Sequence, residues 1–171
     1  MNSVNTMDTK RLTMTALLTA LAILVPFIVV FKVIVPPFSA TLGSHVPMFL
    51  SMFLGPWAAV VVGLGSALGF FLTLGPLIGA RAFMHVFVAL AGATMIQKGV
   101  PYKRAFVITA PIHGLLEVLV VLPFVPFDAY KIFVLTGVGT MLHHGADAII
   151  AYALLKVLSK SRAFSQLRTD S

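Results

Sequence analysis

The chain has 171 residues, of which 59% are hydrophobic and only 10% are charged, and its mean hydropathy is +1.03. These values lie far outside the range of soluble globular proteins and predict an all-α integral membrane protein with one membrane domain. At about 20 residues per span, the length allows roughly five to seven helices and leaves no room for a soluble domain.

Charge and cysteine content exclude further classes of protein. The net charge of +7 does not indicate nucleic-acid binding, because the basic residues lie at the ends of predicted helices and not beside aromatic residues on a polar face. The sequence contains no cysteine, which excludes disulfides and thiolate metal sites.

Six transmembrane helices are predicted in chain order, the second of them short. They cover residues 10–31, 45–54, 56–73, 76–97, 104–122 and 129–159. The first apolar run is too long for the core of a signal peptide and is therefore interpreted as a span. Pro36, Pro37 and several hydroxyl side chains predict that residues 32–44 form an ordered external loop able to fold back as a lid.

The distribution of lysine and arginine predicts that both termini are cytoplasmic. Lys32 and Lys131 are the basic residues at the predicted outer helix ends, whereas nine lie at the inner ends. The nine are Lys10, Arg11, Lys98, Lys103, Arg104, Lys156, Lys160, Arg162 and Arg168. Residues 1–9 are then a disordered cytoplasmic segment, and residues 160–171 are a basic cytoplasmic tail.

Two pairs of small residues predict close contacts between helices. Ala16 and Ala20 share a face of the first helix, and Gly65 and Gly69 share a face of the third, a spacing that lets another helix approach closely. For the alanine pair, packing within the chain and contact with a partner protein both remain open.

Charged and imidazole side chains inside apolar helices indicate a binding site. Arg81 and His85 lie four residues apart, as do His113 and Glu117, so each pair shares one helix face. Arg81 and Glu117 each lie about five residues from the outer ends of their helices and hence at matching depth. Thr140 and His144 bring a third polar stripe to the same region, close to Asp147. A structural ion pair with mutually satisfied histidines is the alternative interpretation, but charge buried in a bilayer favours a ligand cavity.

The residue types in this stripe suit a small carboxylate. An arginine can bind a carboxylate through two hydrogen bonds, and Phe38, Phe70, Phe71, Phe83 and Tyr130 are available to cover its apolar body. Enzyme motifs are missing: His113 to Glu117 is not H-E-x-x-H, and residues 63–69 are not G-x-S-x-G. The adjacent His143 and His144 point to different helix faces, so no metal site is predicted. We expect neither an enzyme nor a cofactor.

The order and motifs of these helices resemble a known family. Residues 41–50, 63–71 and 81–85, together with the small-residue pair of the first helix, are similar to the niacin and pantothenate S components of energy-coupling factor (ECF) vitamin transporters. The resemblance implies a substrate-binding subunit of the cell membrane that captures a vitamin from outside and works with a membrane T component and two ATPases. It implies ligand contacts from Arg81, His85, His113, Glu117, Thr140 and His144, and T-component contacts from Ala16 and Ala20.

Niacin is the expected vitamin, and pantothenate is the alternative, since both carry the carboxylate that Arg81 predicts. A stand-alone secondary transporter is a more distant alternative, which would need an ion-coupling group such as Glu117 or Asp147. Inverted repeats, which many such transporters contain, are not visible in the sequence.

Overall fold

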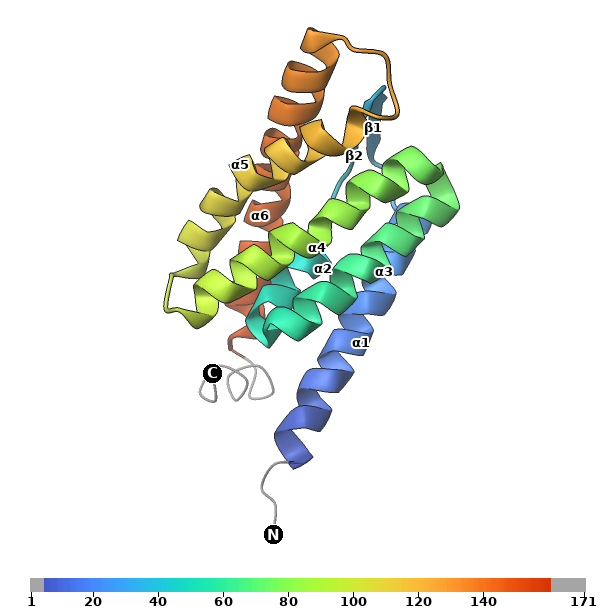
Figure 1. Cartoon of the computed structure of the whole chain (residues 1–171). Helices are drawn as coiled ribbons and strands as arrows, with labels where there is room; N and C mark the ends of the chain where they lie inside the picture. Colours follow the sequence, from blue (N-terminus) through green and yellow to red (C-terminus); the bar gives the residue numbers. More distant parts are fainter. Residues whose placement is uncertain (1–4, 161–171) are drawn as a thin grey trace.

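Helices account for most of the computed structural model, which describes residues 5–160 (Figure 1). In chain order the elements are α1 (Asn5–Ile28), β1 (Lys32–Val35), β2 (Phe38–Thr41), α2 (Val46–Ser51), η1 (Met52–Leu54), α3 (Pro56–Leu74), α4 (Pro76–Gln97), α5 (Tyr102–Val121), η2 (Tyr130–Val138) and α6 (Gly139–Leu158). The described beginning of α1 and the end of α6 lie at the lower end of the molecule in Figure 1.

Five helical segments are long and apolar enough to cross a membrane, so the chain is a multi-pass membrane protein. They are residues 9–28 of α1, then α3, α4, α5, and the continuous segment of η2 and α6. The predicted count of six transmembrane helices is not confirmed. The second helix is short, as predicted, but the six residues of α2 extend only about 9 Å, against about 30 Å of hydrocarbon.

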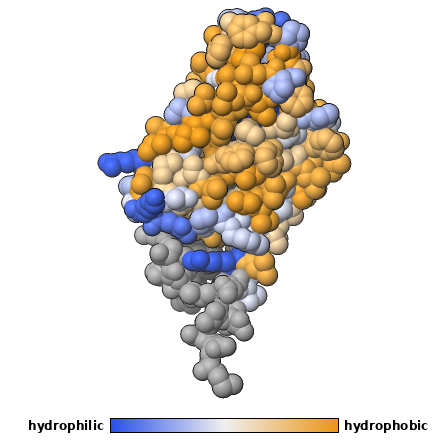
Figure 2. Space-filling model, in the orientation of Figure 1, coloured by the Kyte–Doolittle hydropathy of each residue, from blue (hydrophilic) through white to orange (hydrophobic). Residues whose placement is uncertain are grey.

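The surface matches this assignment. Figure 2 shows a broad apolar surface over the helices, with hydrophilic residues mainly toward the lower end and a smaller group at the top. Helix α2 lies inside this shell, because all six of its residues are buried. It packs against α1, α3, α4 and α6, and its Met48 and Phe49 belong to the main apolar core. The short second helix is therefore a buried element in the interior of the bundle.

The helical fold is as predicted, and the segment between α1 and α2 adds two short strands to it. Strands β1 and β2 form an antiparallel hairpin in which Lys32 pairs with Thr41 and Val35 with Phe38. The hairpin satisfies the backbone hydrogen bonds of a segment that two prolines keep from forming a helix. Strand β2 also packs against η2 and α6, which fixes the hairpin over the interior of the bundle.

Helix boundaries differ from the predicted ones by up to five residues. Helix α1 begins at Asn5, so residues 5–9 are helical where disorder was predicted, and it ends at Ile28. The last helix begins with nine residues of π-helix, in which the Thr136 hydroxyl donates to the carbonyl of Lys131 at 3.0 Å. Residues 1–4 and 161–171 lie outside the described residues.

A glycine directly precedes the proline that starts each of the helices α3 and α4. Gly55 and Gly75 have φ values of 100° and 83°, which favour glycine, and Pro56 and Pro76 occupy the first helical positions. Such a step ends one segment and starts the next within two residues. At Gly75 and Pro76 this gives the tight turn that joins α3 to the antiparallel α4.

Glycines on α3 allow close contact with α1, as predicted. A Cβ atom at Gly65 would lie 2.7 Å from Cγ2 of Thr19, and one at Gly69 would lie 2.8 Å from Cα of Ile23. The pair is thus used for packing within the chain.

Replacing Gly69 with alanine is expected to destabilise the protein by about 1–3 kcal/mol, because the added methyl group meets the backbone of α1. The apparent melting temperature of the detergent-purified chain measures this effect. Gly145→Ala is the matched control, since a Cβ at this position of α6 meets no atom within 4 Å. Equal melting temperatures for the two variants would contradict the proposed packing.

Candidate functional site

All five histidines of the chain meet in the interior of the bundle. The ring centre of His45 lies 4.8 Å from those of both His85 and His113 and 4.4 Å from that of His143. The fifth ring, His144, lies 5.5 Å from His113. The histidines come from the start of α2 and from α4, α5 and α6, so the fold gathers four separate segments at one point.

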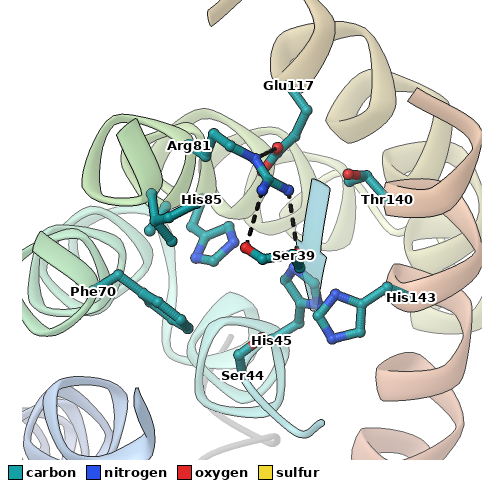
Figure 3. Close-up of a pocket in the computed structure, with 11 residues that line it drawn as sticks. Ser39, Ser44, His45, Phe70, Arg81, His85, Glu117, Thr140 and His143 are labelled. Atoms are coloured by element: carbon teal, nitrogen blue, oxygen red, sulfur yellow. Dashed lines mark hydrogen bonds and ion pairs between the residues drawn. The ribbon is translucent and has the colours of Figure 1, made fainter. Parts of the chain in front are cut away.

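Arg81 of α4 is buried beside this cluster and is held on two sides. Its Nε atom donates to Glu117 Oε2 on α5, forming an ion pair. Its Nη1 atom donates to the carbonyl of Pro37 at 2.9 Å and to the Ser39 hydroxyl at 3.0 Å, while Nη2 reaches the Ser39 carbonyl at 3.3 Å. The guanidinium thus joins the hairpin to α5 across the interior, and Figure 3 shows its contacts with Ser39 and Glu117.

Asp147 of α6 is a second fully buried junction. Its carboxylate accepts hydrogen bonds from the backbone N–H groups of Gly43 (2.7 Å) and His45 (3.0 Å) and from His45 Nδ1 (2.9 Å). His143 Nε2, one turn earlier on α6, lies 3.2 Å from the same carboxylate. Four groups converge on one side chain, which ties the segment after the hairpin to α6.

We expect Asp147→Asn to destabilise the protein by about 2–4 kcal/mol. The amide replaces an acceptor oxygen with a donor NH₂ group that faces N–H groups, and it removes the charge that holds them. The change is measurable as a lower apparent melting temperature. Asp128→Asn, at a half-exposed carboxylate in the turn between α5 and η2, is the control and should leave the melting temperature nearly unchanged.

A small cavity of about 30 Å³ lies between Arg81 and the histidines that contact Asp147. Ser39, Ser44, His45, Phe70, Ile78, Arg81, Ala82, His85, Glu117, Thr140 and His143 line it (Figure 3). This volume holds one or two water molecules and is too small for a vitamin-sized ligand. In this structure the hairpin atoms occupy the Nη donors of Arg81.

The six predicted site residues occupy two layers. Four of them, Arg81, His85, Glu117 and Thr140, line the cavity. The other two, His113 and His144, lie behind it with their Nδ1 atoms 3.2 Å apart. Within residues 9–160, whose side chains the structure describes, the Thr140 hydroxyl is buried and lacks a hydrogen-bond partner, so it is available to a ligand.

Sequence reasoning missed part of the site. His45, Ser39 and Ser44 belong to the first loop and the start of α2, where no helical period indicates which way a side chain points. Of the aromatic residues considered as a cover, Phe70 lines the cavity and Phe38 lies with its ring centre 5.8 Å from the Arg81 guanidinium carbon. Phe71, Phe83 and Tyr130 are exposed on the outer surface.

The predicted partner-contact residues lie on the outside of α1. Ala16 and Ala20 are both exposed, whereas Thr15, Leu18 and Ala22 on the other side of the helix are buried. Packing within the chain thus uses the opposite face of α1, together with the glycines of α3. The alanine face remains accessible to another protein.

Taken together, the site offers a permanent cation, two serine hydroxyls, a threonine hydroxyl, several imidazoles and an aromatic wall. This set can bind a small anion through the guanidinium and hold a flat apolar body beside it. The cavity must become larger before such a ligand fits.

Comparison with known proteins provides one relative. Over 168 residues, which cover 89% of this chain and 76% of the relative, the sequence is 34% identical to the niacin transporter NiaX of Lactococcus lactis subsp. cremoris (strain MG1363). No protein-family model matches the chain, and no solved structure matches it. Because the alignment spans nearly the whole chain, the similarity concerns the complete helical bundle.

Proposed function

The chain belongs to the niacin-transporter family of S components that includes NiaX, and from this premise we propose that it captures nicotinate, the carboxylate form of niacin, for uptake through an ECF-type importer. In this role it binds the vitamin from outside the cell membrane with high affinity. Partner subunits, a membrane T component and two ATPases, supply the energy.

The observation that carries the proposal is the buried guanidinium of Arg81 in the cavity wall. Its Nη atoms bond to the Pro37 carbonyl and to both oxygens of Ser39, and these oxygens stand where the two oxygens of a ligand carboxylate would bind. A carboxylate is a stronger acceptor than a carbonyl or a hydroxyl. Nicotinate therefore competes with the hairpin for the same donors, with its ring beside Phe70 and the imidazoles.

This competition couples binding to movement of the hairpin. When the vitamin binds to the Nη atoms, the hairpin loses its hydrogen bonds with Arg81. The hairpin then moves, and the cavity beneath it becomes larger. Glu117 keeps its contact with Nε, so the guanidinium stays oriented. The proposal needs no enzymatic step, metal or cofactor.

Topology and partner contacts follow the charge pattern. With both termini in the cytoplasm, the hairpin faces outward and the basic loop that contains Lys98, Lys103 and Arg104 faces inward. Because Ala16 and Ala20 are exposed, the face of α1 that carries them is available for contact with the T component.

Uptake of labelled nicotinate separates this role from the alternative one. The chain is produced in cells that lack niacin uptake, either alone or with an ECF module. We expect binding in both cases, and ATP-dependent accumulation only with the module. Accumulation by the chain alone in liposomes under an ion gradient would instead establish a stand-alone secondary transporter.

A further inference from the structure

Three of the buried histidines present ring nitrogens to one another. His45, His85 and His113 come from three different segments and are each at most 4% exposed. One ring nitrogen from each lies within 4.8 Å of the other two. Three imidazoles that converge in this way are the ligand set of many divalent transition-metal sites.

The hydrogen bonds around His113 determine which of its nitrogens is free. His144 Nε2 lies 3.0 Å from the carbonyl oxygen of Phe106, which only accepts, so this nitrogen carries the proton in the neutral ring. His144 Nδ1 is then the acceptor for His113 Nδ1 at 3.2 Å. His113 in its neutral form therefore has an unprotonated Nε2, which is buried and has no hydrogen-bond partner within the described part of the chain.

The surroundings of this lone pair favour a cation. Oxygen Oε1 of Glu117 lies 3.5 Å from His113 Nε2, and it too is an acceptor. Two acceptors that face each other in a buried place repel, unless a positively charged group or a donor lies between them. The carboxylate also lowers the desolvation penalty of a dication held by neutral imidazoles.

The other two rings are oriented in the same manner. Nδ1 of His45 donates to Asp147 at 2.9 Å, and Nδ1 of His85 lies 2.8 Å from the Ser66 hydroxyl. Each contact occupies Nδ1 and leaves Nε2 for another ligand. Histidines that bind metals have this arrangement, in which a carboxylate or another polar group fixes the second nitrogen.

We propose that His45, His85 and His113 form a binding site for a divalent transition-metal ion of the Zn²⁺ or Co²⁺ type through their Nε2 atoms. This site shares His45 and His85 with the wall of the vitamin cavity, and testing it needs neither the vitamin nor the partner subunits. Around an ion with bonds of about 2.0–2.1 Å, tetrahedral ligands are about 3.4 Å apart. One nitrogen of each ring already lies within 4.8 Å of the others, so rotations of the rings and small shifts bring the Nε2 atoms around the ion. The fourth position is open to water or to Glu117.

A second group, His45, His143 and Asp147, is also close enough to hold an ion. Its atoms are already engaged with one another, because Asp147 Oδ2 accepts from His45 Nδ1 and lies 3.2 Å from His143 Nε2. An ion there would have to break these hydrogen bonds, and for this reason the structure favours the first group.

Cobalt is the probe that tests the site. The full chain, purified in detergent without a histidine tag and treated with a chelator, is titrated with Co²⁺ in the absence of nicotinate. We expect one equivalent to bind, with the intense visible d–d absorption of a four-coordinate ion, and Zn²⁺ to remove this absorption. A chain that shows no such absorption, or only the weak bands of six-coordinate aqueous Co²⁺, would overturn the proposal.

Variants identify the ligands. In His85→Gln and His113→Gln, each checked for a single size-exclusion peak, the dissociation constant for Co²⁺ should rise at least tenfold. In His143→Gln the four-coordinate absorption should persist. Loss of Co²⁺ binding in His143→Gln with retention in His113→Gln would place the ion at the second group and overturn the assignment. If His85→Gln or His113→Gln does not fold, the wild-type titration shows whether a four-coordinate site exists, and His143→Gln alone distinguishes the two groups.

Discussion

Replacing Arg81 with alanine is expected to weaken nicotinate binding at least 100-fold. The guanidinium is buried and supplies charge-assisted hydrogen bonds, and removing one partner of such a pair costs about 2–5 kcal/mol. A 100-fold loss corresponds to about 2.7 kcal/mol. Calorimetric titration of the purified variant with nicotinate measures the loss directly.

Two controls separate ligand binding from folding in this experiment. Arg81→Ala leaves Glu117 as a buried unpaired carboxylate, so the double variant with Glu117→Gln removes that charge and should restore stability without restoring binding. Arg81→Lys keeps the charge but not the planar fork, and we expect about a tenfold loss. Wild-type affinity in Arg81→Ala would mean that the carboxylate binds elsewhere.

Bulky residues on the alanine face of α1 should abolish uptake while leaving binding intact. Ala16→Trp combined with Ala20→Trp fills an exposed small-residue face that lies about 12 Å or more along α1 from its end at Ile28. The close approach of another helix needs space on this face. We expect at least a tenfold drop in nicotinate uptake by cells that contain an ECF module, and an unchanged dissociation constant in detergent.

The control for this prediction lies on another helix. Ile149→Trp changes a residue of α6 that is 72% exposed, and it should support normal uptake. Normal uptake by the double α1 variant would remove the assignment of Ala16 and Ala20 to the partner contact. Reduced binding by that variant would instead show that the alanines support the vitamin site from within the chain.

Helical periodicity predicted the part of the site that lies on long helices. Arg81 and His85 share one face of α4, His113 and Glu117 share one face of α5, and equal depth in the bilayer was sufficient to place Arg81 beside Glu117. The helix ends could be read to within a few residues, because glycine and proline mark them at Gly55 and Gly75.

The first loop and the second helix could not be predicted in the same way. Pairing of Lys32 with Thr41 depends on a two-residue turn and on packing against α6, neither of which leaves a periodic pattern. Six residues are too few to show whether α2 crosses the membrane or fills its interior. His45 was missed for this reason, although its ring touches three other histidines at the centre of the site.

The central claim is that this chain alone binds nicotinate, and a calorimetric titration of the detergent-purified protein tests it most directly. We expect tight one-to-one binding of nicotinate without any partner subunit, and much weaker binding of pantothenate. Tight binding of pantothenate with none of nicotinate would contradict the vitamin assignment and establish the alternative one. Binding of neither compound would contradict the role of a vitamin-capturing subunit for these carboxylates.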